Sequence, residues 1–550
     1  MNHHLSRREF VLGGVAAVGV SALGAGCTSG RGSGVVSTDA APPSTPPAAA
    51  PAMGAKPQDI QMPKPNILLF LTDQQRLSAL GCYGPTPCQT PHIDSIGANG
   101  VRFETAYTTT PVCTPARASV MTGMYPHQHG FCCNAEDLQS GMHELRDRPG
   151  LLSRRLLEAG YTCGYTGKWH LGSGQQRMFG YENNPALPKD VGFIGHNFHG
   201  HGGGGFKFRE YQDYLSRNGW KHTVLPRREG KRYPVEYGIT EGPVESTVPY
   251  FLAEHTIGLI KNAIKENKPF FIWHNDWGPH HPLFVPQEYY DMYKDVEIPK
   301  WPNFEFDAVK DAMPFALQRK EPAEAFTWED WAEAIRYYYA FTTLIDHQIG
   351  WVLAFLSETG LDKNTVTVFS SDHGETMGSH GGMEDKGRCN FEEIQRIGLL
   401  FRLPEGQGRK PLPGGTVLKE WASLSDLYPT FCDIAGVGYD KNEVKGRSLW
   451  PLLNGEKPAW RDRILIETNG LLGVAHTMFT IRHQQYKFSA GASGRCELYD
   501  LETDPHEMTN LAPRADMQPL VERMKGVLIE ELKATGCQGS TTYSVIKKCR

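Results

Sequence analysis

The 550-residue chain has little that would suit it to a nucleic acid or to a membrane interior. Charged residues make up only 21% of the sequence and the net charge is -5, so no excess of positive charge favours a nucleic-acid partner. After the N-terminal segment, no stretch is apolar over the roughly 20 residues that a bilayer span requires. The twelve cysteines lack the paired C-x-x-C spacing of a zinc site, and their spacing does not reveal which of them form disulfides. These absences leave a globular protein in which anion binding depends on local positive charge.

The N-terminal segment is typical of an export signal. A twin arginine at positions 7 and 8 precedes a Gly- and Ala-rich apolar stretch from Val11 to Ala25, which is the pattern of a Tat signal. The stretch is short and rich in glycine, which disfavours a transmembrane anchor. Residues 23–27 form an imperfect lipoprotein box, so Cys27 is either a lipid attachment site or an unmodified residue. We predict a signal over 1–27 and an exported protein that is periplasmic, membrane-tethered or extracellular.

The remaining sequence divides into three parts. Residues 28–62 are rich in Pro, Ala, Ser and Gly and cannot bury enough apolar surface to fold, which predicts a disordered tether. The sequence that follows is long enough for one large domain and a smaller one. We predict a catalytic domain over 63–455 and a C-terminal subdomain over 456–550, with an amphipathic helix from Met517 to Ala534.

The most informative segment begins at Cys113. Thr114 is placed to cap a helix, Pro115 suits the first helical position, and Gly123 suits the end of the helix. The free N–H groups and the partial positive charge of the helix N-terminus would lie beside the cysteine. An anionic substrate could be held where that residue reacts; a buried structural thiol is the alternative.

Four apolar runs predict strands of a sheet buried on both faces. The runs are Asn66–Leu71, Tyr161–Thr166, Pro269–Trp273 and Thr365–Ser370. Helical patterns between them, such as Leu151–Ala159 and Trp331–Glu358, indicate an α/β fold with a mostly parallel sheet. Ligands of such sheets bind beyond the carboxyl ends of the strands. The polar residues that follow the four runs are therefore expected to share one site.

The run Cys113-Thr114-Pro115-Ala116-Arg117, continued by Met121-Thr122-Gly123, resembles the signature of the type I sulfatases. In that family the cysteine is oxidised to formylglycine, which implies a formylglycine-generating enzyme as a maturation partner. The resemblance covers nearly the whole chain after the tether. It includes segments to which we assign no chemistry: Thr90–Asp94, Asp426–Thr430, Gly446–Leu453 and Glu497–Pro505. It implies an alkaline-phosphatase-like fold, with a large central sheet flanked by helices and a small C-terminal antiparallel sheet with a helix.

The same resemblance implies a metal site. Asp73 and Asp372 each follow a strand, and although either alone would suit a helix N-cap, both match the metal-binding runs of the family. With His373 and the modified Cys113 they would surround a calcium ion. The chain departs from the commonest pattern at Gln74, where many members carry a second aspartate; a glutamine there resembles choline sulfatases and phosphonate monoester hydrolases. Gln74 can coordinate through its amide oxygen, and the nitrogen ligand leaves Mn²⁺ or Mg²⁺ open.

A sulfate ester in its transition state needs cations and hydrogen-bond donors around it. Arg117 lies one turn from Cys113 and can face the same site. Lys168 and His170 point the same way in an extended segment, although a surface loop around a buried Trp169 is the alternative. Arg117 and Lys168 are therefore expected to hold the formylglycine hydrate and offset the developing charge.

The family mechanism implies the remaining roles. One hydroxyl of the hydrate attacks sulfur, and Asp372 accepts its proton. His280 and Lys386 stabilise or protonate the leaving alkoxide. His170 then removes the proton of the second hydroxyl, which expels sulfate. The assignment of Lys386 depends mostly on the resemblance.

Three functions remain open at this point. The first is a sulfuric ester hydrolase that acts on an extracellular sulfated substrate, with a carbohydrate favoured if Trp273 and Trp277 stack on sugars rather than lie in the core. The second is a phosphonate monoester or phosphodiester hydrolase on the same scaffold. The third is a non-catalytic binder of sulfated glycans, if Cys113 is never oxidised. The glycine-rich run His199–Gly205 is predicted to be a mobile loop near the cleft.

Overall fold

The computed structural model describes residues 64–138, 140–172, 186–226, 234–305, 326–387, 389–404, 412–471 and 474–549. The predicted signal over 1–27, the possible lipid site Cys27 and the tether over 28–62 lie outside the described residues. Within the described ranges, no helix combines the length and the apolar character that a bilayer crossing needs. The predicted boundary between 455 and 456 stays a prediction.

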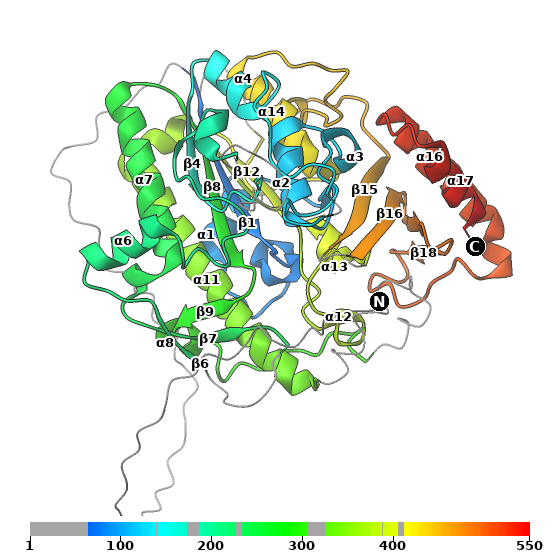
Figure 1. Ribbon diagram of the computed structural model, residues 1–550, viewed down its shortest axis with the longest axis horizontal. Coiled ribbons are helices and arrows are strands. Elements are labelled where there is room, and N and C mark those ends of the chain that lie inside the picture. The colour runs from blue at the N-terminus through cyan, green and yellow to red at the C-terminus, as the bar shows by residue number, and fades with distance from the viewer. Residues whose placement is uncertain are drawn as a thin grey trace, which may run out of the picture. The chain divides into compact units, whose positions relative to one another are not determined.

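A central eight-stranded sheet contains the four predicted strands side by side (Figure 1). Its parallel middle consists of β10 (Thr365–Ser371), β1 (Asn66–Asp73), β8 (Phe270–Pro279) and β4 (Thr162–Gly167). The shorter outer strands are β5 (Ile194–Gly195), β12 (Leu399–Arg402), β2 (Val101–Phe103) and β13 (Thr416–Leu418). The pairings of β12 with β10 and with β2 are antiparallel, and the other pairings are parallel. The predicted α/β fold with a mostly parallel sheet is confirmed.

Helices cover both faces of this sheet, which is why β1 is buried along its whole length. Successive side chains of β1 alternate between two cores, so Leu68 and Phe70 face one core while Leu69 and Leu71 face the other. The first core is covered by α1 (Pro91–Ala98), α7 (Val248–Glu266) and α11 (Trp328–Glu358). The second is covered by α2 (Cys113–Thr122), α4 (Leu152–Glu158) and α14 (Leu427–Ala435), which lie together in Figure 1.

The C-terminal part forms a separate small sheet, as predicted. Its strands β15 (Arg463–Leu471), β16 (Val474–His483), β17 (Tyr486–Gly491) and β18 (Cys496–Asp500) pair antiparallel in chain order. The helix α16 (Gln518–Ala534), expected from Met517 to Ala534, packs its apolar side on this sheet, and α17 (Ser540–Lys548) follows it. Leu528 and Leu532 of α16 share a buried cluster with Phe488 of β17.

Smaller elements complete the described fold. One small sheet contains β3 (Ala106–Tyr107), β11 (Arg396–Ile397) and β14 (Ala422–Ser423), and another contains β6 (Thr223–Pro226), β7 (Tyr237–Glu241) and β9 (Leu283–Pro286). The short helices are α3 (Pro126–His129), α6 (Arg209–Arg217), α8 (Gln287–Asp291), α12 (Ser379–Gly382), α13 (Glu392–Gln395) and α15 (Trp450–Leu453).

A pair of stacked histidines lies beside the carboxyl end of β4. The ring centroids of His196 and His255 are 3.5 Å apart, and His274 is close enough to act on both. The N–H of Gly167 donates to His196 Nδ1 over 3.2 Å. Burial and the neighbouring histidines lower the pKa of His196 well below its usual range, and they lower the pKa of His255 to about 4. Both rings are therefore neutral in the folded protein near pH 7.

We expect this pair to make the fold acid-sensitive. Between pH 6.5 and 4 the unfolded chain binds protons at these positions and the folded chain does not, so stability falls as the pH falls. At pH 4, His255 alone costs about 3 kcal/mol of unfolding free energy. His255→Phe should reduce the change of the melting temperature with pH between pH 6.5 and 4, as measured by calorimetry at each pH. His506→Phe, at an exposed position, is the matched control; an equal flattening in both variants would contradict the assignment.

Candidate active site

Cys113 is the first residue of α2 and is fully buried at the edge of the central sheet. Gly123, with φ 68°, ends the helix as predicted, but Thr114 does not cap it, since Val112 is the N-cap residue and lacks a polar side chain. The hydroxyl of Thr114 instead donates to the carbonyl oxygen of His170 over 2.7 Å, while its N–H donates to Asn134 Oδ1 over 3.2 Å. The helix start is thereby fixed to the segment that contains His170.

Asp73 and Asp372 emerge at the same edge because β1 and β10 are parallel neighbours. Thr72 pairs with Ser371, so the two aspartates leave the sheet side by side. Each carboxylate is fully buried. The Oδ2 atoms of both face the guanidinium of Arg117, at 2.9 Å from Asp73 and 3.1 Å from Asp372. Lys168 Nζ adds a second cation on Asp73 Oδ2, at 2.7 Å.

These cations decide the charge state of Asp73. Burial alone would raise the pKa of Asp73, but Lys168 and Arg117 hold it well below its usual range. Burial would lower the pKa of Arg117, and Asp372 and Asp73 raise it instead. Arg117 also donates to Asn275 Oδ1 over 2.8 Å, which links the group to the end of β8. The site therefore holds two buried carboxylates at ion-pair distance from two buried basic side chains.

The remaining carboxylate oxygens face Cys113 and His373. Asp73 Oδ1 lies 3.7 Å from the sulfur of Cys113, and Asp372 Oδ1 lies 3.5 Å from His373 Nε2, which is itself 3.3 Å from that sulfur. One atom from each of these four residues lies within 4.8 Å of the others, a spacing that one divalent ion could bridge. Burial lowers the pKa of His373, which leaves its Nε2 a neutral ligand. The donor set fits a divalent cation, as the sequence predicts.

A second group with metal-ligand side chains is already balanced by cations. His380, Glu393 and Glu507 also lie within reach of one another. Lys487 forms an ion pair with Glu507, whose pKa burial nevertheless raises to about 8. Arg76 Nη2 lies 3.9 Å from Glu393. This group links the catalytic region to the C-terminal sheet and needs no ion for charge balance.

Gln74 is next to the metal cluster, and its side chain is hydrogen-bonded to other groups. Its side-chain oxygen accepts a hydrogen bond from Lys386 Nζ, and its amide group donates to Glu375. Its backbone N–H donates to Asp372 Oδ1 over 3.1 Å. Gln74 therefore orients Asp372 and Lys386, and its coordination of a metal stays a prediction. Burial would lower the pKa of Lys386, but nearby Cys113 and the carboxylates, Asp385 first, raise it, which keeps the amine charged.

His170 has the hydrogen-bonding pattern of a base. Its Nε2 lies 2.9 Å from Glu136 Oε2, and a proton on Nε2 leaves the lone pair on Nδ1. Nδ1 is buried and has no hydrogen-bond partner among the described residues. Burial would lower the pKa of His170, but Glu136 and Cys113 raise it. The sequence did not single out Glu136, because nothing in the residues around it marks a loop carboxylate that lies 34 positions from its partner.

His280 lies beside another histidine, His201, which the sequence did not assign. His280 Nδ1 lies 2.6 Å from the carbonyl oxygen of His281, and its Nε2 lies 3.3 Å from His201 Nε2. The ring of His201 is also 5.0 Å from that of His170, so it lies between the two histidines. Burial and Lys386 lower the pKa of His280 well below its usual range.

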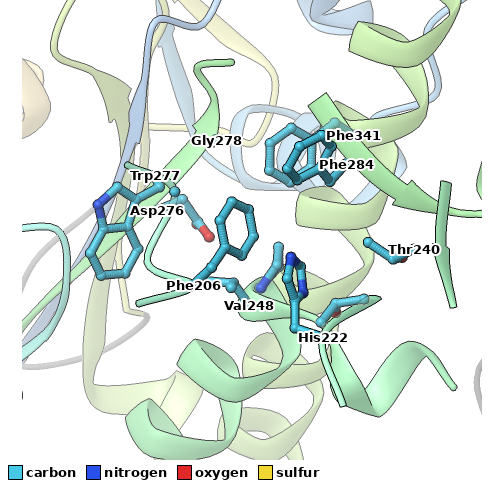
Figure 2. A pocket seen from close by; sticks show the side chains of 12 residues that line it. Phe206, His222, Thr240, Val248, Asp276, Trp277, Gly278, Phe284 and Phe341 are labelled. Carbon is cyan, nitrogen blue, oxygen red and sulfur yellow. The ribbon is translucent and has the colours of Figure 1, made fainter. Parts of the chain in front are cut away.

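The glycine-rich run that contains His201 is packed on aromatic rings. Trp277 Nε1 donates to the carbonyl oxygen of His201 over 2.7 Å, and a Cβ on Gly205 would lie 3.0 Å from the Trp277 ring. Trp277 also lines a cavity of about 20 Å³ with Phe206, Phe284 and Phe341, which has room for about one water (Figure 2). Trp273 and Trp277 are 0% and 4% exposed. Both tryptophans therefore belong to the core and are not available to stack on sugars, which is the second of the two possibilities that the sequence left open.

The residues of this group differ in how far they are exposed to solvent. The carboxylate of Glu136 is 28% exposed and His280 is 9% exposed, whereas Cys113, Arg117 and Lys168 are at 0%. The N-terminus of α2, the side chains of Arg117 and Lys168 and the candidate metal site would each attract an anion. This arrangement defines an enzyme that acts on a negatively charged group.

Comparison with known proteins makes the assignment specific. The chain belongs to the Sulfatase family, which it matches over residues 65–437, and it matches the N-sulphoglucosamine sulphohydrolase C-terminal family over 378–534. It is 30% identical to an arylsulfatase of Clostridium perfringens, over 86% of this chain and 95% of that one. It is 26% identical to an N-acetylglucosamine-6-O-sulfatase of Bacteroides thetaiotaomicron, over 87% of this chain and 88% of that one. The protein is thus a sulfatase, an enzyme class whose members generally use formylglycine and a divalent metal.

Solved structures share the fold. A protein in complex with its substrate D-glucosamine-2-N,6-O-disulfate superposes with a TM-score of 0.65 and 22% identity, over 86% of this chain and 99% of that one. The phosphonate monoester hydrolase of Agrobacterium radiobacter superposes with a TM-score of 0.70 and 24% identity, over 86% of this chain and 96% of that one. The alkaline-phosphatase-like architecture is therefore confirmed.

We expect a divalent cation to stabilise the protein through Asp73 and Asp372. Ca²⁺ at a hundred times its dissociation constant should raise the unfolding free energy by about 2.7 kcal/mol, and chelation should reverse this. Asp372→Asn should abolish the calcium-dependent rise in melting temperature. Glu393→Gln, in the second group, should keep it. The opposite pattern in the two variants would place the ion in the second group.

We also expect Glu136 to act through His170. Glu136→Gln keeps a hydrogen-bond acceptor and removes the charge, so kcat for a sulfate ester should fall by about tenfold or more with little change in KM. His170→Asn should cost roughly 10²–10⁴ in kcat. Glu158→Gln, on the exposed face of α4, is the control. Full activity of Glu136→Gln beside an inactive His170→Asn would show that His170 acts without Glu136.

Proposed function

We propose that this protein removes sulfate from an extracellular sulfated carbohydrate. The observation that supports this most directly is the grouping of Cys113, Asp73, Asp372 and His373 within 4.8 Å, beside the cations Arg117 and Lys168. The same chain thereby provides a modifiable cysteine, a metal site and positive charge for a sulfate group. Proteins that only bind sulfated glycans have no need of the first two.

Cys113 is proposed to be converted to formylglycine by a formylglycine-generating enzyme, and the metal is proposed to be Ca²⁺, with Mn²⁺ or Mg²⁺ as alternatives. When present, the two groups supply a nucleophilic hydroxyl and Lewis-acid polarisation of the sulfate oxygens. Asp73, Asp372, His373 and the modified residue 113 would hold the ion. The mixed oxygen and nitrogen donors are compatible with all three metals.

The side chains of the site have separable tasks. Arg117 and Lys168 hold the carboxylates in place and offset the charge that develops on sulfate. Asp372 has an oxygen directed towards the cluster and would accept the proton of the attacking hydroxyl. His170, with its free Nδ1 lone pair, would take the second proton when sulfate is expelled.

Lys386 and His280 would assist the leaving alkoxide. Lys386 is cationic because its pKa is raised by its neighbours, so it can donate a proton or a hydrogen bond to that oxygen. His280 is neutral in the folded protein and its Nε2 is hydrogen-bonded to His201. We therefore assign Lys386 the charge stabilisation, and we assign His280 the orientation of the departing group.

The choice of a carbohydrate is supported by the relatives. They include an N-acetylglucosamine-6-O-sulfatase, an endo-4-O-sulfatase and an ulvan-active sulfatase, each similar to this chain over most of its length. The twin arginine at positions 7 and 8 supports export by the Tat route to the periplasm or cell surface, and Cys27 is proposed as a possible lipid anchor. An exported enzyme meets polymeric sugars before they are taken up.

Phosphonate monoester or phosphodiester hydrolysis is the second candidate. Gln74 in place of an aspartate, together with the shared fold of the Agrobacterium enzyme, favours it. Removal of one negative charge beside the metal would accommodate groups other than a sulfate monoester. A direct comparison of substrates separates the two candidates.

We expect turnover of sulfated mono- and oligosaccharides to exceed that of a matched phosphodiester and phosphonate monoester, with the ratio of kcat/KM values as the measure. Cys113→Ala should abolish the activity, because no other described residue supplies the nucleophile. Cys132→Ser, which changes a cysteine outside the site, is the control. Mass spectrometry of the peptide with residue 113 should show an aldehyde. Preferred turnover of the phosphorus esters, or undiminished activity of Cys113→Ala, would end the proposal.

A further inference from the structure

A polar cavity of about 700 Å³ lies at the junction of the catalytic region and the C-terminal sheet. Its walls come from the segment after α14, the start of β15 and the end of α16, elements labelled in Figure 1. The backbone N–H groups of Lys445 and Gly446 both donate to the carbonyl oxygen of Gly123, the residue that ends α2. Cys113 starts the same helix, so it lies about 15 Å along the helix axis from Gly123, which contacts the cavity wall.

Positive charge predominates in the cavity although the chain as a whole is negative. Five cations line it against two carboxylates, while the net charge of the protein is -5. The cations are Lys441, Lys445, Arg447, Arg461 and Arg463, and the carboxylates are Asp462 and Glu531. Such a local reversal of charge attracts anions.

Among the described residues, ion pairs neutralise two of these cations. Arg461 forms an ion pair with Asp426 at 2.7 Å, and Arg463 forms one with Asp462 at 3.0 Å. Within the described part of the chain, Lys441, Lys445 and Arg447 have no carboxylate at ion-pair distance. Lys441 and Arg447 are also exposed. The side chains of Lys441 and Arg447 are therefore available to an external anion.

The cavity wall is held by one buried carboxylate. Asp426 is 0% exposed, and its Oδ1 accepts both the backbone N–H of Arg447 and the guanidinium of Arg461, each over 2.7 Å. The backbone of Arg447 and the guanidinium of Arg461 are thereby fixed relative to each other before any ligand arrives. The run Gly446–Leu453, to which the sequence assigns no chemistry, supplies part of this wall.

Aromatic rings lie among the charges. Tyr125, Tyr439 and Trp460 line the cavity, and the guanidinium of Arg461 lies 5.4 Å from the centre of the Trp460 ring. Guanidinium groups bind sulfate and carboxylate groups, and aromatic faces pack against the apolar faces of sugar rings. The volume is that of an oligosaccharide-sized ligand site rather than of a single ion.

We propose that this cavity is a second binding site for a sulfated oligosaccharide, in which Lys441 and Arg447 contact its sulfate groups. In its choice of ligand the inference rests on the proposed function. A bound chain would be kept on the enzyme between reactions at Cys113, which raises the effective concentration of further sulfate esters.

Binding to Cys113→Ala protein tests this without turnover. Calorimetric titration with a heparin hexasaccharide should give a dissociation constant that rises by about tenfold or more when Lys441→Glu and Arg447→Glu are added, because two charge-assisted contacts are lost. The control pair Lys419→Glu and Arg495→Glu changes two exposed cations outside the cavity by the same charge. The control pair should change the dissociation constant by less than about twofold.

Two further probes identify the ligand. Desulfated hexasaccharide should bind at least about tenfold more weakly than the sulfated one. Equal binding of the two, equal loss in the control pair, or displacement by sodium sulfate at the same concentration of sulfate groups would overturn the proposal. In the active enzyme, which retains residue 113 as Cys113 or its modified form, Lys441→Glu with Arg447→Glu should raise KM for sulfated polymer and leave turnover of a small aryl sulfate unchanged. Because the titration needs no activity, a protein that failed as a sulfatase would still give its result.

Discussion

The clamp of Arg117 on two carboxylates is the interaction on which the rest of the site depends. One guanidinium holds Asp73 from β1 and Asp372 from β10, and it is itself placed by α2. Buried carboxylates repel each other and lose hydration, so they need this opposite charge to remain ionised. Their other oxygens are then left for an ion, beside Cys113. The side chain of Arg117 thus links the sheet, the helix α2 and the candidate metal site.

The main features of this site were predictable because they follow from topology. Apolar runs predict parallel strands, and parallel strands end at one edge, so Asp73 and Asp372 had to lie together. The resemblance to the sulfatases added Cys113 and the cations. The structure also places Lys168 on Asp73 and Lys386 on Gln74. The first pair is separated by 95 positions in the sequence and the second pair by 312.

The rest could not be predicted because it depends on loops and on packing. Glu136 and His201 lie in segments with no periodic pattern, and only the folded chain shows that they face His170 and His280. Thr114 has the residue type of a helix cap, yet its hydroxyl is bonded to the segment of His170. Trp277 is of a type that often contacts sugars, and here it supports a glycine-rich turn instead. Local residue type does not reveal the partner when that partner is distant in sequence.

The complete burial of Cys113 would limit when another enzyme could modify it. In the folded protein the backbone around this cysteine belongs to α2 and lies at the edge of the central sheet, so an enzyme that had to bind this backbone would need the segment before it folds. Asp372 follows Cys113 by 259 residues (372 minus 113), so β10 leaves the ribosome well after the cysteine does. At roughly 5–20 residues per second, this gap amounts to about 13–52 s. Synthesis order would thus give a maturation enzyme a brief opportunity that folding later closes.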